Sequence, residues 1–250
     1  MKVIAIACQK GGTSKTTTTL CLGAGLHRAG LDVLHIDIDP QGSLSLCLNA
    51  AQGVNVYDIL IDGKPINRAL QTTPQGALIA ADGRLSARGL LTRKGDENRL
   101  ARALEPLRSR YDVALIDAPP QLGPLSMNAL NAADAVVIPM RPDRLSLNAL
   151  HELHSTIQVI RQTTNPALEI YGIIVSMYDG RTTAHRLMLD EITEQAKALG
   201  VKVYNPPIRR SIALEEIQIT GKSIFDNPRS NAAQDYQAII NQIIEQMKGE

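Results

Sequence analysis

Short apolar runs alternate with amphipathic stretches along most of the chain. Apolar runs of this length are typical of buried strands, and they fall at residues 3–8, 33–38, 77–81, 113–117, 135–139 and 172–176. Helical patterns lie between them: one leads from about residue 15 to a C-terminal cap at Gly30, and others cover 97–109, 145–163, 184–199 and 230–248. Strands that alternate with helices predict an α/β fold, a mostly parallel twisted sheet with helices on both faces.

The length of 250 residues fits a single domain spanning 1–250, and the chain contains no internal repeat and no low-complexity tract. The most charged and irregular stretch, 81–96, is expected to be a surface excursion rather than a domain boundary. The first candidate functional motif begins at residue 9, which leaves no room before it for an N-terminal helix-turn-helix domain. We therefore do not expect site-specific operator binding.

Composition favours a cytoplasmic protein. The three cysteines form no even framework and no Cys-x-x-Cys pair, which indicates a reducing compartment. No signal peptide precedes the first strand, and no apolar run approaches the ~20 residues that cross a bilayer. The net charge of +1 gives no bulk attraction to nucleic acid, so any DNA binding must come from a local basic patch.

The stretch CQKGGTSKTTTT, residues 8–19, lies between a predicted strand and a predicted helix, where a phosphate-binding loop belongs. Backbone N–H groups at a helix N-terminus favour an anion, and Gly11 and Gly12 permit its close approach. Lys15 would reach the β- and γ-phosphates. The usual pattern places glycine where this chain has Gln9 and Ser14. The candidate nucleotide-binding residues are Gly11, Gly12, Thr13, Ser14, Lys15, Thr16 and Thr17, with the Thr16 hydroxyl on Mg²⁺.

Two predicted strands end in aspartates at the same edge of the sheet, the edge at which ligands bind in such folds. Asp37 and Asp39 leave one strand on the same face, where paired carboxylates orient a water or hold a hydrated metal. Asp117 ends another strand in the arrangement of a Walker B carboxylate, which reaches Mg²⁺ usually through water. Each aspartate alone also fits a solvated strand end. Together with the loop they favour a nucleotide hydrolase.

Taken together, these motifs resemble the ParA/MinD group of ATPases, and most closely the short ParA-type partition ATPases. QKGGTSKT (9–16) is similar to the deviant Walker A loop of that group, Lys-Gly-Gly-x-Gly-Lys-Thr. The resemblance continues through IDIDPQG, IDAPPQLG, NALNAADAVVIPM, GIIVSMYDGRTT and GKSIFDNPRSNAAQDY, nearly the whole chain. It implies a phosphate-loop NTPase fold and an ATPase that uses ATP and Mg²⁺ and is slow without its partner.

The resemblance also implies roles for individual residues. Lys10 would cross to the partner subunit's ATP in a sandwich dimer, as an arginine finger does. Asp39 would position the attacking water and, with Lys10 and Lys15, carry catalysis, while Asp37 would support the Mg²⁺ region. The adenine pocket would be built by Met177, Tyr178, Pro206 and Pro207. Ser14 stands where the family has glycine, so nucleotide binding is expected to survive while the hydrolysis rate differs.

The same resemblance predicts a surface for double-stranded DNA of any sequence. Arg181 matches an arginine that the family uses for this contact, and one further family arginine is Ala213 here. Each basic residue, judged alone, is a solvated surface group. The expected DNA-binding residues are Arg181, Arg209, Arg210, Lys222 and Arg229, with Arg186 as a supplement. Few charges per subunit predict binding that is weak for a monomer, stronger for a dimer and steeply dependent on salt.

The leading hypothesis is an ATP-dependent DNA partition ATPase, associated with the nucleoid in its ATP state and stimulated by a ParB-like partner. A MinD-like membrane-associated positioning ATPase is the first alternative. Its anchor would be the amphipathic tail 235–250, but the charges of this tail are mainly acidic, which favours a helix packed on the core. A metabolic or iron–sulfur carrier ATPase of the same fold is the second, and the chain lacks the paired cysteines that it would need.

Overall fold

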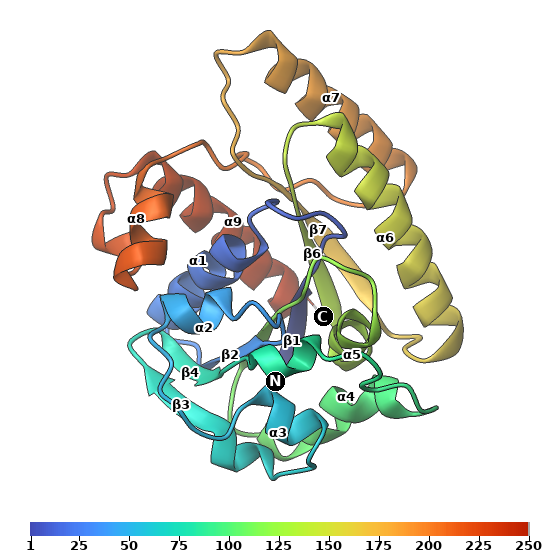
Figure 1. Ribbon diagram of the computed structural model, residues 1–250. Helices are drawn as coiled ribbons and strands as arrows, with labels where there is room; N and C mark the ends of the chain where they lie inside the picture. The colour runs from blue at the N-terminus through green and yellow to red at the C-terminus, as the bar shows by residue number, and fades with distance from the viewer. Residues whose placement is uncertain (250) are drawn as a thin grey trace.

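Residues 1–249, which the computed structural model describes, form a seven-stranded sheet in the order β3-β4-β2-β5-β1-β6-β7 (Figure 1). The strands are β1 (Lys2–Ile6), β2 (Val33–Asp37), β3 (Leu70–Thr73), β4 (Gly76–Ile79), β5 (Val113–Asp117), β6 (Ala135–Met140) and β7 (Glu169–Val175). All neighbouring pairs are parallel except β3 with β4, so the antiparallel strand lies at one edge. The predicted α/β fold is confirmed.

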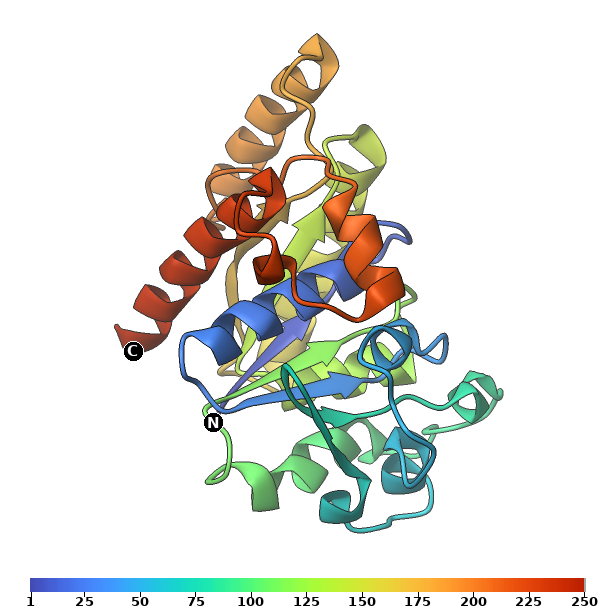
Figure 2. The same ribbon diagram turned by 90° about the vertical axis from the view of Figure 1, so that its left-hand side faces the viewer.

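Helices cover both faces of this sheet (Figures 1 and 2). They are α1 (Lys15–Arg28), α2 (Ser43–Cys47), α3 (Val56–Leu60), α4 (Arg99–Leu104), α5 (Pro124–Ala132), α6 (Arg144–Thr163), α7 (Thr183–Ala198), α8 (Ala213–Thr220) and α9 (Asn231–Lys248). The apolar side chains of α1, α2, α8 and α9 join one core, and those of α3 to α7 join the other. Successive residues of β1 belong alternately to the two cores, as expected for a strand that is buried on both faces.

Helix α9 is a core helix, as its acidic charges predicted. Its residues Tyr236, Ile239, Ile240 and Ile243 are fully buried, and the helix packs against α1. Within residues 1–249 no helix is long and apolar enough to span a membrane.

The six predicted strands are all present, and the predicted helices differ chiefly in one place. The helix expected over 97–109 is an α-helix only from Arg99 to Leu104 and then tightens into a 3₁₀ turn at Glu105–Leu107. Pro106 lies in that turn, and because it lacks an N–H it cannot continue the α-helical ladder. The pattern missed the short elements α2, α3 and β3, and it missed α5 and α8, whose apolar residues do not repeat over enough turns.

A buried polar chain connects the middle of the sheet to the end of α8. His35 of β2 is fully buried, and its Nε2 lies 3.1 Å from the backbone oxygen of Gln75. The Gln75 side-chain amide in turn donates to the carbonyl of Gly221 at 3.1 Å. Burial lowers the pKa of His35 to about 4, since the charged imidazolium would lose its hydration. The imidazole is therefore neutral in the folded protein.

His35 gives the protein an acid-sensitive stability. The unfolded chain takes up a proton at this residue below its ordinary pKa of about 6.5, whereas the folded chain resists until about 4. Unfolding is thus increasingly favoured as pH falls through that window, by on the order of 2–3 kcal/mol. Urea unfolding at pH 7 and pH 4.5 should show a smaller loss in His35→Asn than in the wild type. An unchanged pH dependence in the variant would contradict this assignment.

Candidate nucleotide-binding site

The loop between β1 and α1 presents a buried lysine at a helix N-terminus. Lys15 opens α1, is buried, and donates from Nζ to the carbonyl oxygen of Lys10 at 3.0 Å. Gly12 adopts a positive φ of 71°, which the tight turn requires. Burial lowers the pKa of Lys15, while Cys8, Asp117 and Asp39 partly offset that effect. Among the described residues no carboxylate lies within ion-pair distance of Lys15, so its charge remains available to an anion.

Thr16 and Asp117 lie together beside this lysine and fit a magnesium ion. The Thr16 hydroxyl donates to Asp117 Oδ2 at 2.7 Å, while Asp117 Oδ1 is buried and has no hydrogen-bond partner. Burial, with the nearby Asp37 charge, raises the pKa of Asp117 to about 8. A buried oxygen without a donor next to a threonine hydroxyl suits a hydrated Mg²⁺, which would also relieve the cost of the charge. Residues 1–249 hold no cluster of three His, Cys, Asp or Glu side chains that could bind a metal unaided.

Asp37 is placed differently from Asp117, because protein donors engage both of its oxygens. Its Oδ2 accepts from the backbone N–H and the hydroxyl of Ser45 at 2.8 and 2.7 Å, and its Oδ1 accepts from the Asp39 N–H at 3.2 Å. Burial raises the pKa of Asp37 to about 6, against these hydrogen bonds. Asp37 therefore fixes the turn that carries Asp39, and its predicted role at the Mg²⁺ site stays a prediction.

Asp39 itself faces a cavity of about 450 Å³. The cavity lies between the turn at Asp39–Gln41, the turn at Leu85 and the segment Pro119–Leu125 that follows β5. Asp39 is only half-buried, and its carboxylate accepts a hydrogen bond from the Gln41 N–H at 3.0 Å. A carboxylate in an open cavity beside the phosphate loop is suited to orient a water, and its role stays a prediction.

Ser14 adopts a left-handed backbone conformation, which a glycine would reach without strain. Its φ is 69° and ψ 28°, and its hydroxyl lies 3.2 Å from the Ser176 hydroxyl. Met177, next to Ser176, is also left-handed, with φ 56°. Such strain costs about 1–3 kcal/mol per residue and tends to gather at functional sites.

The Ser14 hydroxyl is expected to offset much of this strain. Ser14→Ala keeps the strained backbone and loses the hydrogen bond, so we expect it to be about 1 kcal/mol less stable than the wild type. Ser14→Gly loses the same bond but also relieves the strain, so its stability should stay within about 1 kcal/mol of the wild type. Urea midpoints rank the three proteins. Ala more stable than Gly would contradict this account.

A cavity of about 310 Å³ opens beside the phosphate loop and is a candidate base pocket. Of the four residues predicted for the adenine site, Met177 lines it. Tyr178 instead lines a neighbouring cavity, and Pro206 and Pro207 line neither. Met177 is thus the predicted residue that lines this cavity, and the roles of Tyr178, Pro206 and Pro207 at the base stay predictions. The full lining is Ser14, Thr17, Arg141, Ser176, Met177, Arg210, Ser211, Leu214, Glu215, Gln218 and Tyr236.

Lys10 is held within its own subunit by Asp143. Its Nζ lies 2.7 and 2.8 Å from the two Asp143 carboxylate oxygens, and both side chains are partly exposed. Asp143 also caps α6 by accepting from the Ser146 N–H at 2.9 Å. Burial, the largest single effect, opposes ionisation of Asp143, but the hydrogen bonds from Lys10 and Ser146 and the charge of Lys10 together outweigh it and lower the pKa of Asp143. Lys10 must leave this ion pair before it can reach another subunit.

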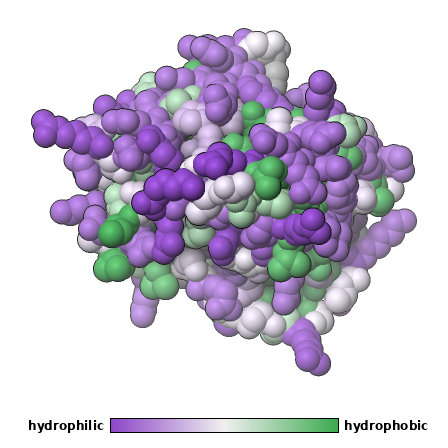
Figure 3. All heavy atoms as spheres, turned by 90° about the horizontal axis from the view of Figure 1, so that it is seen from above, coloured by the Kyte–Doolittle hydropathy of each residue, from purple (hydrophilic) through white to green (hydrophobic). Residues whose placement is uncertain are grey.

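Only three of the five basic residues predicted to bind DNA lie together. Arg181, Arg209 and Arg210 line one cavity of about 650 Å³, and the exposed Lys222 and Arg229 do not. Arg181 is paired with Asp179 at 2.8 Å and Arg209 with the buried Asp235 at 2.7 Å. Within residues 1–249 Arg210 has no ion-pair partner, which makes its charge the most available of the three. Seen from the side of α7, the surface is largely hydrophilic (Figure 3).

Three polar residues of the site were not anticipated. Ser45 holds Asp37, Asp143 holds Lys10, and the Gln218 amide donates to Thr17 Oγ1 at 2.7 Å. Asp143 carried a signal, since an Asp directly before a helical pattern predicts an N-cap. Ser45 and Gln218 carried none, because their partners lie in other segments of the chain.

The fold and this site define a nucleotide hydrolase of the phosphate-loop class. A protein-family model described as an AAA domain matches residues 1–170. Sporulation initiation inhibitor protein Soj of Bacillus subtilis (strain 168) is 38% identical over 249 residues, with 94% of this chain and 95% of that protein covered. Chromosome partitioning protein ParA of Caulobacter vibrioides (strain NA1000 / CB15N) is 37% identical, with 90% and 86% covered. The chain belongs to the ParA/Soj family of partition ATPases.

Solved structures agree with this fold. Cobyrinic acid a,c-diamide synthase from Mycobacterium smegmatis, crystallised with ADP and magnesium, is 33% identical, with a TM-score of 0.86 and coverage of 100% of this chain and 97% of that one. A second crystal structure of the same synthase, with the same identity, coverage and TM-score, holds an ATP analogue and magnesium. The similar proteins thus include nucleotide–magnesium complexes.

Proposed function

We propose that this protein is an ATP-switched DNA partition ATPase. ATP and Mg²⁺ drive two subunits into a sandwich dimer, the dimer binds double-stranded DNA of any sequence, and a ParB-like partner stimulates hydrolysis and release. The protein then resides in the cytoplasm and joins the nucleoid in its ATP state. The observation that carries the proposal is one loop with two lysines in different positions: Lys15 is buried near the Asp117 oxygen that has no hydrogen-bond partner among residues 1–249, and Lys10 is partly exposed and paired with Asp143.

The surface around Lys10 supports dimerisation through the nucleotide face. Leu122 follows β5 and is 50% exposed, and Leu145 in the first turn of α6 is 68% exposed. Leu122 follows β5 and Leu145 follows β6, the two strands that flank β1. Both leucines therefore lie at the same edge of the sheet as the phosphate loop, which follows β1. A second copy placed there would cover these leucines and bring a second Lys10 to the nucleotide.

Arg210 tests the DNA surface through the salt dependence of retention, with ATP binding measured in the same variant because Arg210 also lines the candidate base pocket. Removal of Arg209 would leave the buried Asp235 unpaired and destabilise the fold, whereas Arg210 has no such partner. Arg210→Ala is expected to weaken retention on random duplex DNA and to reduce the slope of log affinity against log salt by roughly two, one phosphate contact per subunit. The matched control is Arg68→Ala, an exposed arginine near β3 at the opposite edge of the sheet. Equal slopes in both variants would contradict the assignment.

The membrane alternative has less support. The apolar face of α9, which would have to enter the lipid, is buried against α1. Vesicle flotation with ATP and Mg²⁺ separates the two hypotheses: we expect the protein to stay with DNA and not to float with anionic vesicles. Flotation without DNA retention would favour the membrane-associated ATPase.

A further inference from the structure

The N-cap serine of α1 makes a contact that does not cap its own helix. Ser14 occupies the N-cap position, where a serine hydroxyl usually accepts from a backbone N–H two or three residues further on, but its side chain accepts no such bond. The hydroxyl instead lies 3.2 Å from the Ser176 hydroxyl, 162 residues away in the sequence. Ser176 directly follows β7, so this contact joins the phosphate loop to the end of another strand. The Ser14 side chain thereby leaves the first N–H groups of α1 to an anion.

Ser176 is buried, and its hydroxyl has one proton for three oxygens. The acceptors are Oγ of Ser14 at 3.2 Å, the carbonyl oxygen of Thr13 at 3.3 Å and the carbonyl oxygen of Met140 at 3.2 Å. The first two belong to the phosphate loop and the third ends β6. Because a hydroxyl rotates about its C–O bond, a small displacement of the loop changes which oxygen receives the proton.

Met177, the next residue, is held in a left-handed conformation from both sides. Its φ is 56°. Before it, the Ser176 N–H donates to the Met140 carbonyl oxygen at 2.7 Å, and after it, the Tyr178 N–H donates to the Ile208 carbonyl oxygen at 3.0 Å. A strained backbone of this kind persists only where the surrounding contacts fix it. The conformation at Met177 therefore depends on where Ser176 is held.

The residues that follow Met177 belong to the candidate DNA surface. Tyr178 to Arg181 line the cavity of about 650 Å³, in the connection between β7 and α7 (Figure 1). Asp179 accepts from the Arg181 backbone N–H at 3.1 Å and from its Nε at 2.9 Å, so the position of Asp179 fixes that of the guanidinium. The Arg210 N–H donates to the Tyr178 carbonyl oxygen at 3.0 Å. A displacement at the end of β7 thus reaches two arginines through one short segment.

We propose that the contact between the Ser14 and Ser176 hydroxyls couples phosphate binding in the loop to the conformation of residues 177–181, and thereby to the DNA affinity of the same subunit. Both serines act as positioning residues. The inference rests on the proposed function, and it adds a route within one subunit to the dimerisation proposed above. Ser14 stands where the family pattern has glycine, which has no hydroxyl to offer, so the link belongs to this chain in particular. The element with two arrangements is the Ser176 hydroxyl, between the loop and β6.

The probe for this link must lack a base. Met177 also lines the candidate base pocket, so a bound base would act on the segment directly. Tripolyphosphate with Mg²⁺ carries phosphates alone and can act only through the loop. The intact protein is studied at a concentration where sedimentation shows a monomer, which removes the contribution of dimerisation.

Hydrogen exchange measured by mass spectrometry provides the main result. In the wild type, tripolyphosphate should slow exchange at least about threefold both in the loop, residues 8–19, and in residues 176–182. Ser14→Ala and Ser176→Ala should keep the effect in the loop and lose it in residues 176–182. In Ser176→Ala the backbone N–H still donates to Met140, so the end of β7 should stay folded. Protection of the loop in each variant confirms that the variant is folded and binds phosphate.

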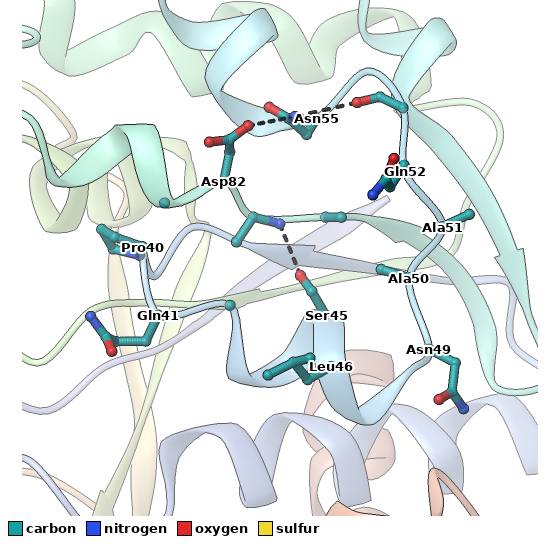
Figure 4. A pocket seen from close by; sticks show the side chains of 15 residues that line it. Pro40, Gln41, Ser45, Leu46, Asn49, Ala50, Ala51, Gln52, Asn55 and Asp82 are labelled. Atoms are coloured by element: carbon teal, nitrogen blue, oxygen red, sulfur yellow. Dashed lines mark hydrogen bonds between the residues drawn. The ribbon is translucent and has the colours of Figure 1, made fainter.

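The matched control is Ser45→Ala, which removes a buried hydroxyl on the other side of the loop. Ser45 follows β2, and β2 and β7 lie on opposite sides of β1. Its hydroxyl donates to Asp37 at 2.7 Å and accepts from the Ala81 N–H at 2.9 Å, beside a cavity of about 930 Å³ (Figure 4). Ser45→Ala should therefore keep the effect of tripolyphosphate in residues 176–182.

Retention on random duplex DNA, with a non-hydrolysable ATP analogue and Mg²⁺, is the second result. It should be about fivefold weaker in each of Ser14→Ala and Ser176→Ala than in the wild type. Wild-type retention in both variants would overturn the proposal.

The exchange results can overturn the proposal in four ways. These are protection of the wild-type loop without an effect in residues 176–182, an effect there that both serine variants keep, its loss in Ser45→Ala, and loss of loop protection in the serine variants. An effect of the ATP analogue but not of tripolyphosphate would assign the signal to the base instead. Failure of the proposed function is distinguishable: a wild-type loop that tripolyphosphate does not protect, or a wild type that does not retain DNA, refutes that function itself.

Discussion

Replacing Lys15 with alanine is expected to abolish ATP-dependent retention on DNA and to lower ATP hydrolysis by about a hundredfold or more. The buried ammonium lies at the N-terminus of α1 without a carboxylate partner, so it is set to meet phosphate oxygens. Loss of this charge removes electrostatic stabilisation in a site from which water is largely excluded. Radiolabelled ATP turnover and DNA retention measure the effect.

Because Lys15 is buried, a second variant must show that the loss of hydrolysis is not caused by unfolding. Lys15→Met keeps most of the side-chain volume and should melt near the wild-type temperature while showing the same loss of hydrolysis. Lys94→Ala, at an exposed lysine in the 81–96 excursion, should hydrolyse ATP normally. Hydrolysis by Lys15→Met within a few-fold of the wild type would show that the loop is not the phosphate site.

The second large effect is expected at Lys10. Lys10→Ala should bind ATP as the wild type does but should hydrolyse it about a hundredfold more slowly at concentrations where the wild type dimerises. The reason is that the Lys10 side chain is paired with Asp143 and is proposed to act only on the ATP of a partner subunit. Nucleotide binding by fluorescence, sedimentation and hydrolysis measured on the same sample separate these steps.

Asp143→Asn is the companion to this variant. Asparagine caps a helix as well as aspartate does, so α6 should be preserved while the ion pair is lost. A partly exposed ion pair is worth about 1 kcal/mol or less, so release of Lys10 should favour dimerisation by no more than about fivefold per subunit, or about thirtyfold for a dimer that frees two Lys10 side chains. A normal hydrolysis rate in Lys10→Ala would refute the role in trans, and a large gain or loss in Asp143→Asn would show that the pair does more than hold Lys10.

The sheet could be predicted from the sequence because a strand that is buried on both faces is apolar at nearly every position. Strands such as Val113–Asp117 are apolar up to their last residue and end at the edge of the sheet where the site forms. The edge strand Leu70–Thr73 is only partly buried, so its composition resembles that of a loop. Helix α8 buries only Ile217, and its other isoleucine, Ile219, is exposed, so its apolar residues do not form the regular one-sided pattern by which a helix is predicted.

The parts of the site that lie within one short stretch of sequence could be predicted from that sequence. The phosphate loop and the strand-end aspartates are short motifs, and Thr16 and Asp117 do meet. The contacts that hold these parts join distant segments: Lys10 and Asp143 are 133 residues apart, and Thr17 and Gln218 are 201 apart. Such pairings depend on the packing of whole elements. For the same reason the sequence could not distinguish Asp117, with a free oxygen, from Asp37, whose oxygens are both engaged.

One measurement tests the central claim most directly: retention of the purified protein on two unrelated random duplexes of equal length, at low salt, with ATP and Mg²⁺, with ADP and Mg²⁺, and without nucleotide. We predict retention only with ATP and Mg²⁺, equal on both sequences, and cooperative in protein concentration as dimerisation requires. Retention that is the same in all three nucleotide states, or that differs between the two sequences, would contradict an ATP-switched, sequence-independent partition ATPase.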